Sequence, residues 1–155
     1  MVIQKSSTKT ALELDNFESL VDKRLNSIFQ KLIKNETTID ESISYALSNP
    51  GKRIRPTLVF LVGDFLGVEA SRLESVAGAI ELIHTYSLVH DDLPCMDDDD
   101  LRRGKPTLHK KFNESTAVLA GDALQTLAFN LILEDKNLDS AEKQELLSDL
   151  AKRIG

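Results

Sequence analysis

Residues 71–100 read SRLESVAGAIELIHTYSLVHDDLPCMDDDD, an apolar stretch that runs directly into six aspartates. Its apolar residues cover most of the circumference of a helix, which predicts a long helix over residues 71–93. Pro94 cannot continue this helix and ends or bends it. Because a helix that is apolar on nearly all sides needs neighbours on several sides, the stretch predicts the central member of a multi-helix bundle.

The rest of the chain predicts more helices and no strand. Apolar residues at three- and four-residue steps predict an amphipathic helix over 10–35. The segment 56–66 is apolar almost throughout and begins with Pro56 at a favourable first helical position. Alternating β-branched runs and hairpin turn pairs are absent, so we predict an all-α fold with one domain over 1–155. The other predicted elements are helices at 39–47, 115–133 and 141–154 and a polar loop at 97–107.

Composition limits the kind of protein and its partners. The 155 residues are 41% hydrophobic and 28% charged, as in ordinary soluble domains. The net charge is −6, which the six aspartates alone supply, so no broad basic surface is expected to bind nucleic acid. The single cysteine, Cys95, permits no internal disulfide and favours a reducing compartment. No stretch approaches signal-peptide or membrane-spanning length, so we expect a cytoplasmic enzyme without a transmembrane segment.

The aspartates at 91, 92 and 97–100 repel one another unless cations lie among them. The basic residues that follow, Arg102, Arg103 and Lys105, are too few to neutralise all six. Clusters of carboxylates suit hard divalent ions, and Mg²⁺ takes one or two carboxylates, waters and the oxygens of a substrate phosphate. The run therefore predicts a metal-assisted diphosphate site, with a solvated acidic loop as the alternative.

The spacing of these aspartates sets a geometric condition for that site. On a regular helix Asp91 and Asp97 point about 120° apart and cannot share an ion. Pro94 allows the residues between them to loop out, which would draw Asp97 back toward Asp91. Spacing alone does not decide whether the chain does so.

Two groups of cations are candidates for binding phosphate. Arg102 and Arg103 carry guanidinium groups that grip phosphate oxygens in pairs, although either could instead pair with the preceding aspartates. Residues 51–56 read GKRIRP and place three cations just before the positive end of the helix predicted to start at Pro56. An anion would make this arrangement favourable, and an ordinary surface loop is the alternative.

Two histidines, His84 and His90, lie on the helix predicted over residues 71–93. His84 lies seven residues before Asp91 and projects from nearly the same face, where a structural core histidine is the alternative role. His90 is predicted to be structural. Neither His90 nor Cys95 has a recognisable partner for nucleophilic catalysis, so Cys95 is predicted to be inert.

Three separated blocks, in matching order and spacing, resemble the trans-isoprenyl diphosphate synthases. The similarity is closest to bacterial-type farnesyl diphosphate synthases (geranyltranstransferases). The blocks are GKRIRP at 51–56, ELIHTYSLVHDDLPCMDDDDLRRGKPTLH at 81–109 and AVLAGDALQTLAF at 117–129. The anchor is an aspartate-rich motif followed by a double arginine and a glycine, here Asp91, Asp92, Asp97, Arg102, Arg103 and Gly104.

This resemblance implies an all-helical bundle of the isoprenoid synthase type, usually homodimeric, around a deep cavity. It implies a prenyltransferase that joins dimethylallyl or geranyl diphosphate to isopentenyl diphosphate, giving farnesyl diphosphate and releasing diphosphate. Geranylgeranyl diphosphate synthase is the alternative. By the same resemblance Asp91 and Asp97 bind Mg²⁺ with support from Asp92, and Arg102 holds the allylic diphosphate. The residues implied to hold isopentenyl diphosphate are Lys52, Arg55, His84 and Arg103.

The resemblance also points to residues that limit product length. In this family the limit is set by bulk five and four positions before the first aspartate motif, which here are Tyr86 and Ser87. An aromatic residue at the former position, with Pro94 and Cys95 as extra residues inside the motif, resembles farnesyl-producing members. Tyr86 as a plain core residue is the alternative.

One departure from the family pattern bears on activity. Family members are longer and carry a second aspartate-rich motif on later helices, which this sequence lacks. We therefore expect the chain to be the amino-terminal portion of a polyprenyl synthase domain and to turn over weakly or not at all by itself. The alternatives are a noncatalytic helical subunit, a terpene cyclase, which would lack the Lys52 and Arg55 site, and a metal-dependent phosphohydrolase.

Overall fold

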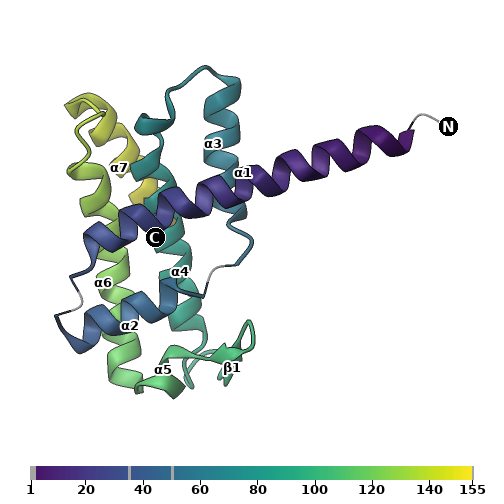
Figure 1. Cartoon of the computed structure of the whole chain (residues 1–155). Helices are drawn as coiled ribbons and strands as arrows, with labels where there is room; N and C mark the ends of the chain where they lie inside the picture. The colour runs from purple at the N-terminus through teal and green to yellow at the C-terminus, as the bar shows by residue number, and fades with distance from the viewer. Residues whose placement is uncertain (1–2, 35, 50, 155) are drawn as a thin grey trace.

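The computed structural model describes residues 3–34, 36–49 and 51–154, with side chains from Phe17 onward. Within these residues the chain forms a bundle of helices with one short hairpin (Figure 1), which confirms the predicted all-α class. In chain order the elements are α1 (Ile3–Leu32), α2 (Thr38–Leu47), α3 (Ile54–Phe65), the 3₁₀ helix η1 (Ala70–Arg72), α4 (Glu74–Asp91), β1 (Leu101–Arg102), β2 (Lys105–Pro106), α5 (Leu108–Lys111), α6 (Glu114–Leu133) and α7 (Ser140–Ile154).

The centre of the bundle is the pair α4 and α6, which lie side by side (Figure 1). Around them, α1 and α3 pack on α4, while α2, α5 and α7 pack on α6. The two central helices approach closely because a side chain on one meets a glycine on the other. A Cβ at Gly121 would lie 2.1 Å from His90 Nε2, and one at Gly78 would lie 2.7 Å from Leu131 Cδ2. Fully buried members of this interface include Ala77, Ala79, Leu82, Ala117, Ala120, Leu124 and Ala128.

Side-chain caps fix the starts of two helices. At α2, Thr37 Oγ1 accepts a hydrogen bond from the Asp40 amide, and Asp40 Oδ2 accepts one from the Thr37 amide, each at 3.1 Å. At α6, Asn113 Oδ1 accepts from the Thr116 amide at 2.8 Å. Both caps satisfy amides that have no partner within the helix, so each start is set by local sequence.

Three predicted helix starts differ from the structure by two residues or more. The helix predicted over 71–93 covers Glu74–Asp91 and follows the 3₁₀ helix η1. The first helix begins at Ile3 rather than at residue 10, and its predicted end at Asn35 lies outside the described residues. The third begins at Ile54, so the prediction that Pro56 occupies the first helical position is wrong. Pro56 is the third residue of α3, still in the first turn, where its missing amide removes no hydrogen bond within the helix.

The prediction that the chain has no strand is wrong at residues 101–106. Here β1 and β2 pair antiparallel, Leu101 with Pro106 and Arg102 with Lys105. The two residues between them, Arg103 and Gly104, have φ values of 54° and 78°. Positive φ at both central positions is typical of the type I′ turn, which suits the twist of a tight hairpin. Strands of two residues are too short to show an alternating pattern in the sequence.

The expectation that no stretch approaches membrane-spanning length is wrong for α6. Its 20 residues are long and apolar enough to cross a membrane by length and composition alone. In the structure the helix lies against α4, α2 and α5. Its apolar composition is therefore accounted for by its central position in the bundle.

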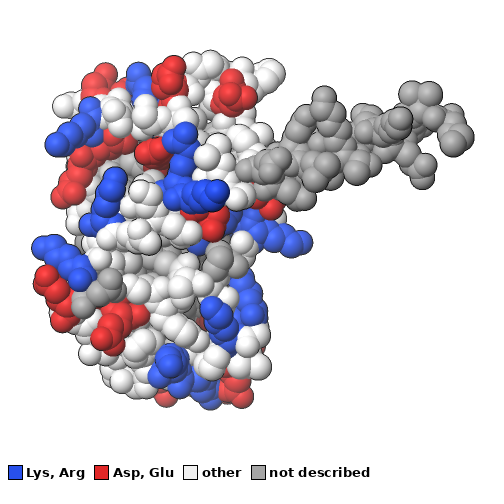
Figure 2. Space-filling view, viewed as in Figure 1, with Lys and Arg blue, Asp and Glu red and all other residues white. Residues whose placement is uncertain are grey.

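Charged side chains of both signs are interspersed on the face drawn in Figure 2. Ion pairs connect helices of the bundle. Arg24 of α1 pairs with Glu74 of α4, and Arg72 of η1 pairs with Glu142 of α7. All four side chains are more than a third exposed, so each ion pair contributes about 0–1 kcal/mol to the free energy of unfolding. The bundle therefore depends mainly on its apolar core.

Two leucines of α6 test this account of the core. Leu124 is fully buried and Leu119 is 55% exposed on the same helix. Leu124→Ala is expected to lower the free energy of unfolding by about 2–5 kcal/mol, because it removes buried surface and leaves a cavity. Leu119→Ala is the matched control and should change it by less than about 0.5 kcal/mol. Urea unfolding followed by circular dichroism measures both, and equal losses would contradict the packing described.

Candidate active site

The chain turns back on itself directly after α4. That helix ends at Asp91, and the Asp97 amide then donates a hydrogen bond to the Asp91 carbonyl at 2.8 Å. The turn is closed by the Met96 and Asp98 amides, which donate to the Leu93 carbonyl at 2.9 and 3.1 Å. The backbone therefore makes the return that the break at Pro94 allowed, and it brings residues 91 and 97 together.

Asp91 and Asp97 meet the chemical requirements of a Mg²⁺ site. Asp91 is half-buried and Asp97 is exposed, and neither side chain makes a hydrogen bond or ion pair within the part of the chain that the structure describes. No group of three carboxylate, imidazole or thiol side chains is placed to hold a metal among the described residues. Mg²⁺ does not require one, because it takes one or two carboxylates together with waters and substrate phosphate oxygens. The donor set fits that ion.

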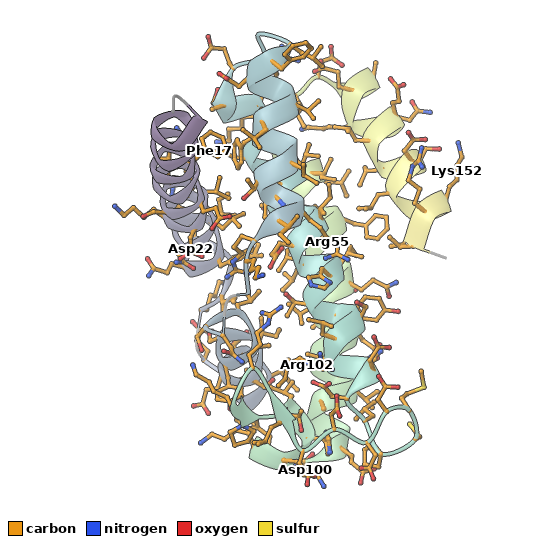
Figure 3. All side chains as sticks on the ribbon, turned by 90° about the vertical axis from the view of Figure 1, so that its right-hand side faces the viewer. Phe17, Asp22, Arg55, Asp100, Arg102 and Lys152 are labelled. Carbon is orange, nitrogen blue, oxygen red and sulfur yellow. The ribbon has the colours of Figure 1, made fainter. Side chains whose placement is uncertain are left out.

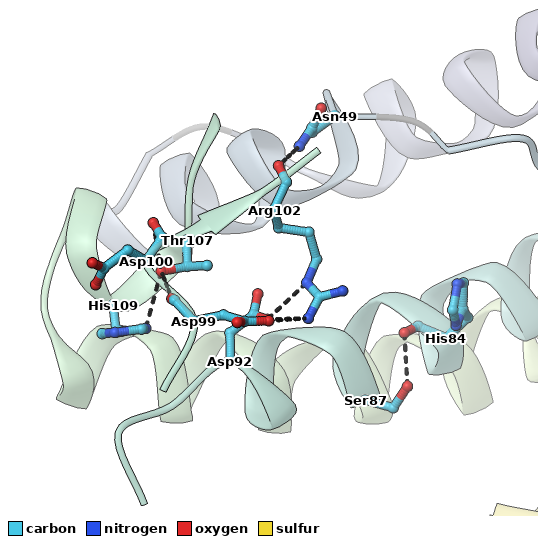
Figure 4. A network of polar contacts seen from close by, with 9 residues as sticks. All are labelled: Asn49, His84, Ser87, Asp92, Asp99, Asp100, Arg102, Thr107 and His109. Carbon is cyan, nitrogen blue, oxygen red and sulfur yellow. Dashed lines mark hydrogen bonds and ion pairs between the residues drawn. The ribbon is translucent and has the colours of Figure 1, made fainter. Parts of the chain in front are cut away.

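Asp92, by contrast, is bound to Arg102. The Asp92 side chain is buried, and Arg102 donates to its Oδ1 through Nε at 2.7 Å and also through Nη2 (Figure 4). Nη2 also donates to Asp99 Oδ2 at 3.1 Å. The hydrogen bond to Asp92 is the main cause that raises the pKa of Arg102. The alternative in which Arg102 pairs with preceding aspartates is thus present in the structure.

The hairpin is tied to the basic loop at residues 51–55. Asn49 Nδ2 donates to the Arg102 carbonyl at 2.9 Å, and Arg103 Nη1 donates to the Asn49 carbonyl at 2.8 Å. The Arg103 guanidinium packs directly on Gly51, where an added Cβ would lie 2.4 Å from Nη2. These contacts hold the arginines of the hairpin beside the cations of the loop. Sequence reasoning missed Asn49, although Asn before Pro-Gly is a strong turn signal.

Thr107 and His109 hold the other side of the aspartate loop. Thr107 Oγ1 donates to the Asp99 carbonyl at 2.7 Å, and the Thr107 amide donates to the Asp100 carbonyl at 3.0 Å. His109 is buried, and its Nδ1 lies 3.2 Å from Thr107 Oγ1 (Figure 4). These contacts fix the path of the loop between Asp97 and β1. Neither residue was predicted, because nothing in the local pattern distinguishes them from other polar residues.

The basic loop comprises residues 51–53 and the first two residues of α3, and its three cations are of two kinds. Lys52 and Arg55 are exposed, and Arg55 lies in the first turn of α3, at the end where a helix attracts anions. Arg53 is buried and donates to Glu81 of α4 at 2.5 Å. Two cations therefore remain available to a ligand, rather than the three that the sequence offered. Figure 3 shows Arg55 and Arg102 one below the other along α4.

His84 lies between the two groups of cations. Burial is the largest cause that lowers its pKa below 6.5, and the charge of Arg55 is the next. Arg103 and Arg102 act in the same direction, while Glu81 opposes them. Burial first, and the positive field of the neighbouring arginines second, thus favour the neutral form of the imidazole. That field is the one that an anion such as diphosphate would experience.

Two hollows meet at His84. A cavity of about 50 Å³ brings His84 together with Asp92, Arg102 and Arg103. A larger groove of about 480 Å³ lies between α4 and α7 and also reaches Arg55. The cations around His84 thus adjoin a groove with a mostly apolar lining, to which α7 also contributes Asp149 and Arg153. The side chains that give the groove its apolar character are Val76, Ile80, Ile83, Ile132, Leu146, Leu150 and Ile154.

The two positions expected to limit product length differ in their surroundings. Ser87 lines the groove between α4 and α7. Tyr86 is not among the lining residues, and its ring packs edge-on against His90, with 5.0 Å between the ring centroids. His90 Nε2 in turn donates to the Val118 carbonyl of α6 at 3.1 Å. This bond agrees with the structural role predicted for His90.

Comparison with known proteins places this chain in a family. The family model described as polyprenyl synthetase matches residues 36–154. The chain belongs to this family. The farnesyl diphosphate synthase of Haemophilus influenzae is 45% identical over 143 residues, which are 92% of this chain and 48% of that protein. Geranylgeranyl pyrophosphate synthase 7 of Arabidopsis thaliana is 43% identical over 145 residues, 90% of this chain and 42% of that protein.

A solved structure supports the same assignment of the fold. The geranyltransferase of Legionella pneumophila superposes with a TM-score of 0.90 at 40% identity, over 97% of this chain and 53% of that one. This confirms that the helices belong to the isoprenoid synthase type of bundle. The chain spans about half the length of the curated relatives that it matches.

The structure unites part of the predicted site. It joins Asp91 to Asp97 through the backbone, Asp92 to Arg102, and Arg103 to the basic loop. Lys52 makes no contact of this kind within the described residues and extends into solvent. Sequence reasoning missed four supporting residues. Two of them gave a signal, Asn49 as a turn residue before Pro-Gly and Glu81 as a carboxylate on an apolar helix, and Thr107 and His109 gave none. Arg53 was among the three predicted cations, but its burial against Glu81 was not predicted.

The lowered pKa of His84 can be measured directly. Proton NMR should give a pKa below 6.5 for the His84 imidazole, whose signal is the one missing from the spectrum of His84→Gln. Because the unfolded chain binds this proton more readily, His84 should lower the free energy of unfolding as pH falls from 6.5 through the lowered pKa. Added inorganic pyrophosphate should raise the midpoint, since an anion offsets the field of the arginines. Titration at or above 6.5 without ligand, or no response to pyrophosphate, would contradict this electrostatic account.

Proposed function

We propose that this chain supplies the first-aspartate and diphosphate-binding half of a Mg²⁺-dependent prenyltransferase. The reaction joins dimethylallyl or geranyl diphosphate to isopentenyl diphosphate, gives farnesyl diphosphate and releases diphosphate. The observation that carries the proposal is the return of Asp97 to Asp91 beside a cluster of arginines fastened to the basic loop. Farnesyl diphosphate synthases among the relatives favour this product, and a geranylgeranyl pyrophosphate synthase among them keeps the longer product as the second candidate.

Asp91 and Asp97 would hold Mg²⁺ in this proposal. When bound, the ion would offset negative charge on the allylic diphosphate and on the diphosphate that departs. Arg102 would add charge on the same side, because its Nη1 makes no hydrogen bond within the described residues. Asp92 would act through Arg102 by fixing its guanidinium, not as a metal ligand.

A second diphosphate would bind on the basic side. Lys52 and Arg55 offer exposed charges, and Arg103 lies beside them through its bond to Asn49. His84 would add a further donor, with the proton held on its ring more firmly once the anion is present. The two diphosphates would thus lie on either side of the small cavity that Arg102, Arg103 and His84 line.

The chemistry follows from this separation of charge. The allylic carbon–oxygen bond breaks with its electron pair leaving on diphosphate, and the double bond of isopentenyl diphosphate attacks the cationic carbon. The coupled carbocation would then lose a proton to the released diphosphate, and the electron pair of that carbon–hydrogen bond would restore a double bond. Preorganised cations beside the leaving oxygens lower the barrier to the first step. The apolar groove beyond His84 would hold the hydrocarbon and exclude water that could capture the cation.

The setting of the protein is part of the proposal. We propose a single domain and a cytoplasmic location, as expected from length and composition, and a homodimer, as the family resemblance implies. The alternative, a noncatalytic helical subunit, would form a stable complex with a catalytic partner on size-exclusion chromatography. Saturable binding of isopentenyl diphosphate would separate the synthase from a terpene cyclase.

Two neighbouring aspartates test the metal site. In the complete product of the reading frame, Asp97→Asn should lower Mg²⁺-dependent condensation of geranyl and isopentenyl diphosphates by about 100-fold or more. Asp98→Asn is the matched control, since Asp98 is equally exposed and an asparagine tolerates its φ of 53°. Titration calorimetry of Mg²⁺ with inorganic pyrophosphate gives a reading independent of turnover. Turnover that survives chelation, or equal losses in the two variants, would refute the assignment. The same assay on the 155-residue chain tests the expectation that it is weak alone.

Tyr86 tests the assignment of the product. Tyr86→Ala removes a ring from α4 five positions before Asp91 and should lengthen the product beyond farnesyl diphosphate. Chromatography of the dephosphorylated products measures chain length. Phe65→Ala is a suitable control, because its ring is 87% exposed and lies on α3 rather than on the helix that carries Tyr86 and Asp91. Unchanged farnesyl output from Tyr86→Ala would remove Tyr86 as a length determinant.

A further inference from the structure

Arg53 is a buried cation in an uncommon backbone conformation. Its side chain is 4% exposed, although it lies between the two exposed cations Lys52 and Arg55. Its φ of 46° and ψ of 32° fall in the left-handed region, which few residues other than glycine adopt. Conformations of this kind persist only where surrounding contacts hold them.

Those contacts come from three helices. Arg53 Nη1 donates to Glu81 Oε1 of α4 at 2.5 Å, and this carboxylate is itself only 4% exposed. Nη2 donates to the Leu47 carbonyl at the end of α2, and Nε donates to Asp22 Oδ1 of α1, each at 3.2 Å. The guanidinium therefore fastens the turn before α3 to the ends or faces of three other elements.

Stability alone does not account for this arrangement. A buried ion pair loses the hydration of both charges, and well-packed apolar residues of similar volume often replace such a pair without loss of stability. The left-handed backbone at Arg53 adds a further cost. The ion pair fixes the path of the backbone on either side of Arg53, and an apolar replacement would not do so.

The residues so directed are those of the basic side. Lys52 precedes Arg53 directly, Arg55 follows two residues later, and Glu81 lies three residues before His84 on α4. Arg53, Glu81 and His84 line one cavity together with Arg102 and Arg103. The buried pair thus lies beneath the side chains to which the proposed function assigns the second diphosphate.

We propose that Arg53 and Glu81 form a positioning pair that sets Lys52, Arg55 and His84 at the spacing required by the diphosphate of isopentenyl diphosphate. The inference rests on the proposed function. Arg53 does not bind the ligand itself, because Glu81, Leu47 and Asp22 occupy its donors and its side chain is buried. Its effect is therefore confined to the affinity for one of the two substrates.

The first variant is Glu81→Gln in the complete product of the reading frame. It should raise KM for isopentenyl diphosphate by about tenfold, because small displacements of oriented groups are costly, while kcat and KM for geranyl diphosphate change less than about twofold. Glu74→Gln is the matched control. Glu74 lies two helical turns earlier on α4 and pairs with Arg24 of α1, away from the cavity. It should leave all three constants unchanged.

A second variant separates positioning from folding. Arg53→Met combined with Glu81→Leu replaces the pair by apolar side chains and should keep the wild-type melting temperature. We expect KM for isopentenyl diphosphate to remain raised about tenfold in this stable protein, because the apolar side chains do not fix the path of the turn before α3. A folded double variant with the wild-type KM would overturn the proposal, whatever the stability of Glu81→Gln. Wild-type protein that fails to saturate with isopentenyl diphosphate would instead refute the proposed function.

Discussion

The arrangement of the site depends on electrostatic repulsion among six neighbouring aspartates. The structure relieves it unequally: Arg102 takes Asp92 and Asp99, and Lys110 takes Asp100 at 2.8 Å. The other three, Asp91, Asp97 and Asp98, form no ion pair within the described residues. Negative charge is thus left unpaired where the turn after α4 brings Asp97 to Asp91, and that residual charge is what favours a divalent cation there.

Arg102, the partner of Asp92 and Asp99, also connects the acidic side to the basic side. Arg102 is held by Asp92 through its side chain and by Asn49 through its carbonyl. Asn49 also accepts the hydrogen bond of Arg103, so one residue before the basic loop fixes both arginines of the hairpin. Asn49 therefore joins Arg102 of the acidic side to Arg103 of the basic side.

The sequence predicted what depends on periodicity and missed what depends on tertiary contacts. The apolar residues of α4 and α6 predicted central helices because their burial follows directly from their spacing. The hairpin was missed because its strands are two residues long and its turn uses Arg103 rather than the usual asparagine. The burial of Arg53 could not be read from GKRIRP, because three cations look alike until Glu81 of α4 selects one of them.

The selection of Arg53 has an electrostatic consequence for the whole site. With that charge compensated by Glu81, the basic side keeps Lys52, Arg55 and Arg103, whose side chains are exposed. Burial is the largest cause of the lowered pKa of His84, and the positive field of Arg55, Arg103 and Arg102 lowers it further. In the proposed function a diphosphate would meet this field with Arg103 already held in place by Asn49 and Gly51. The protein alone thus preorganises Arg103, whereas the acidic side would be completed by a cation.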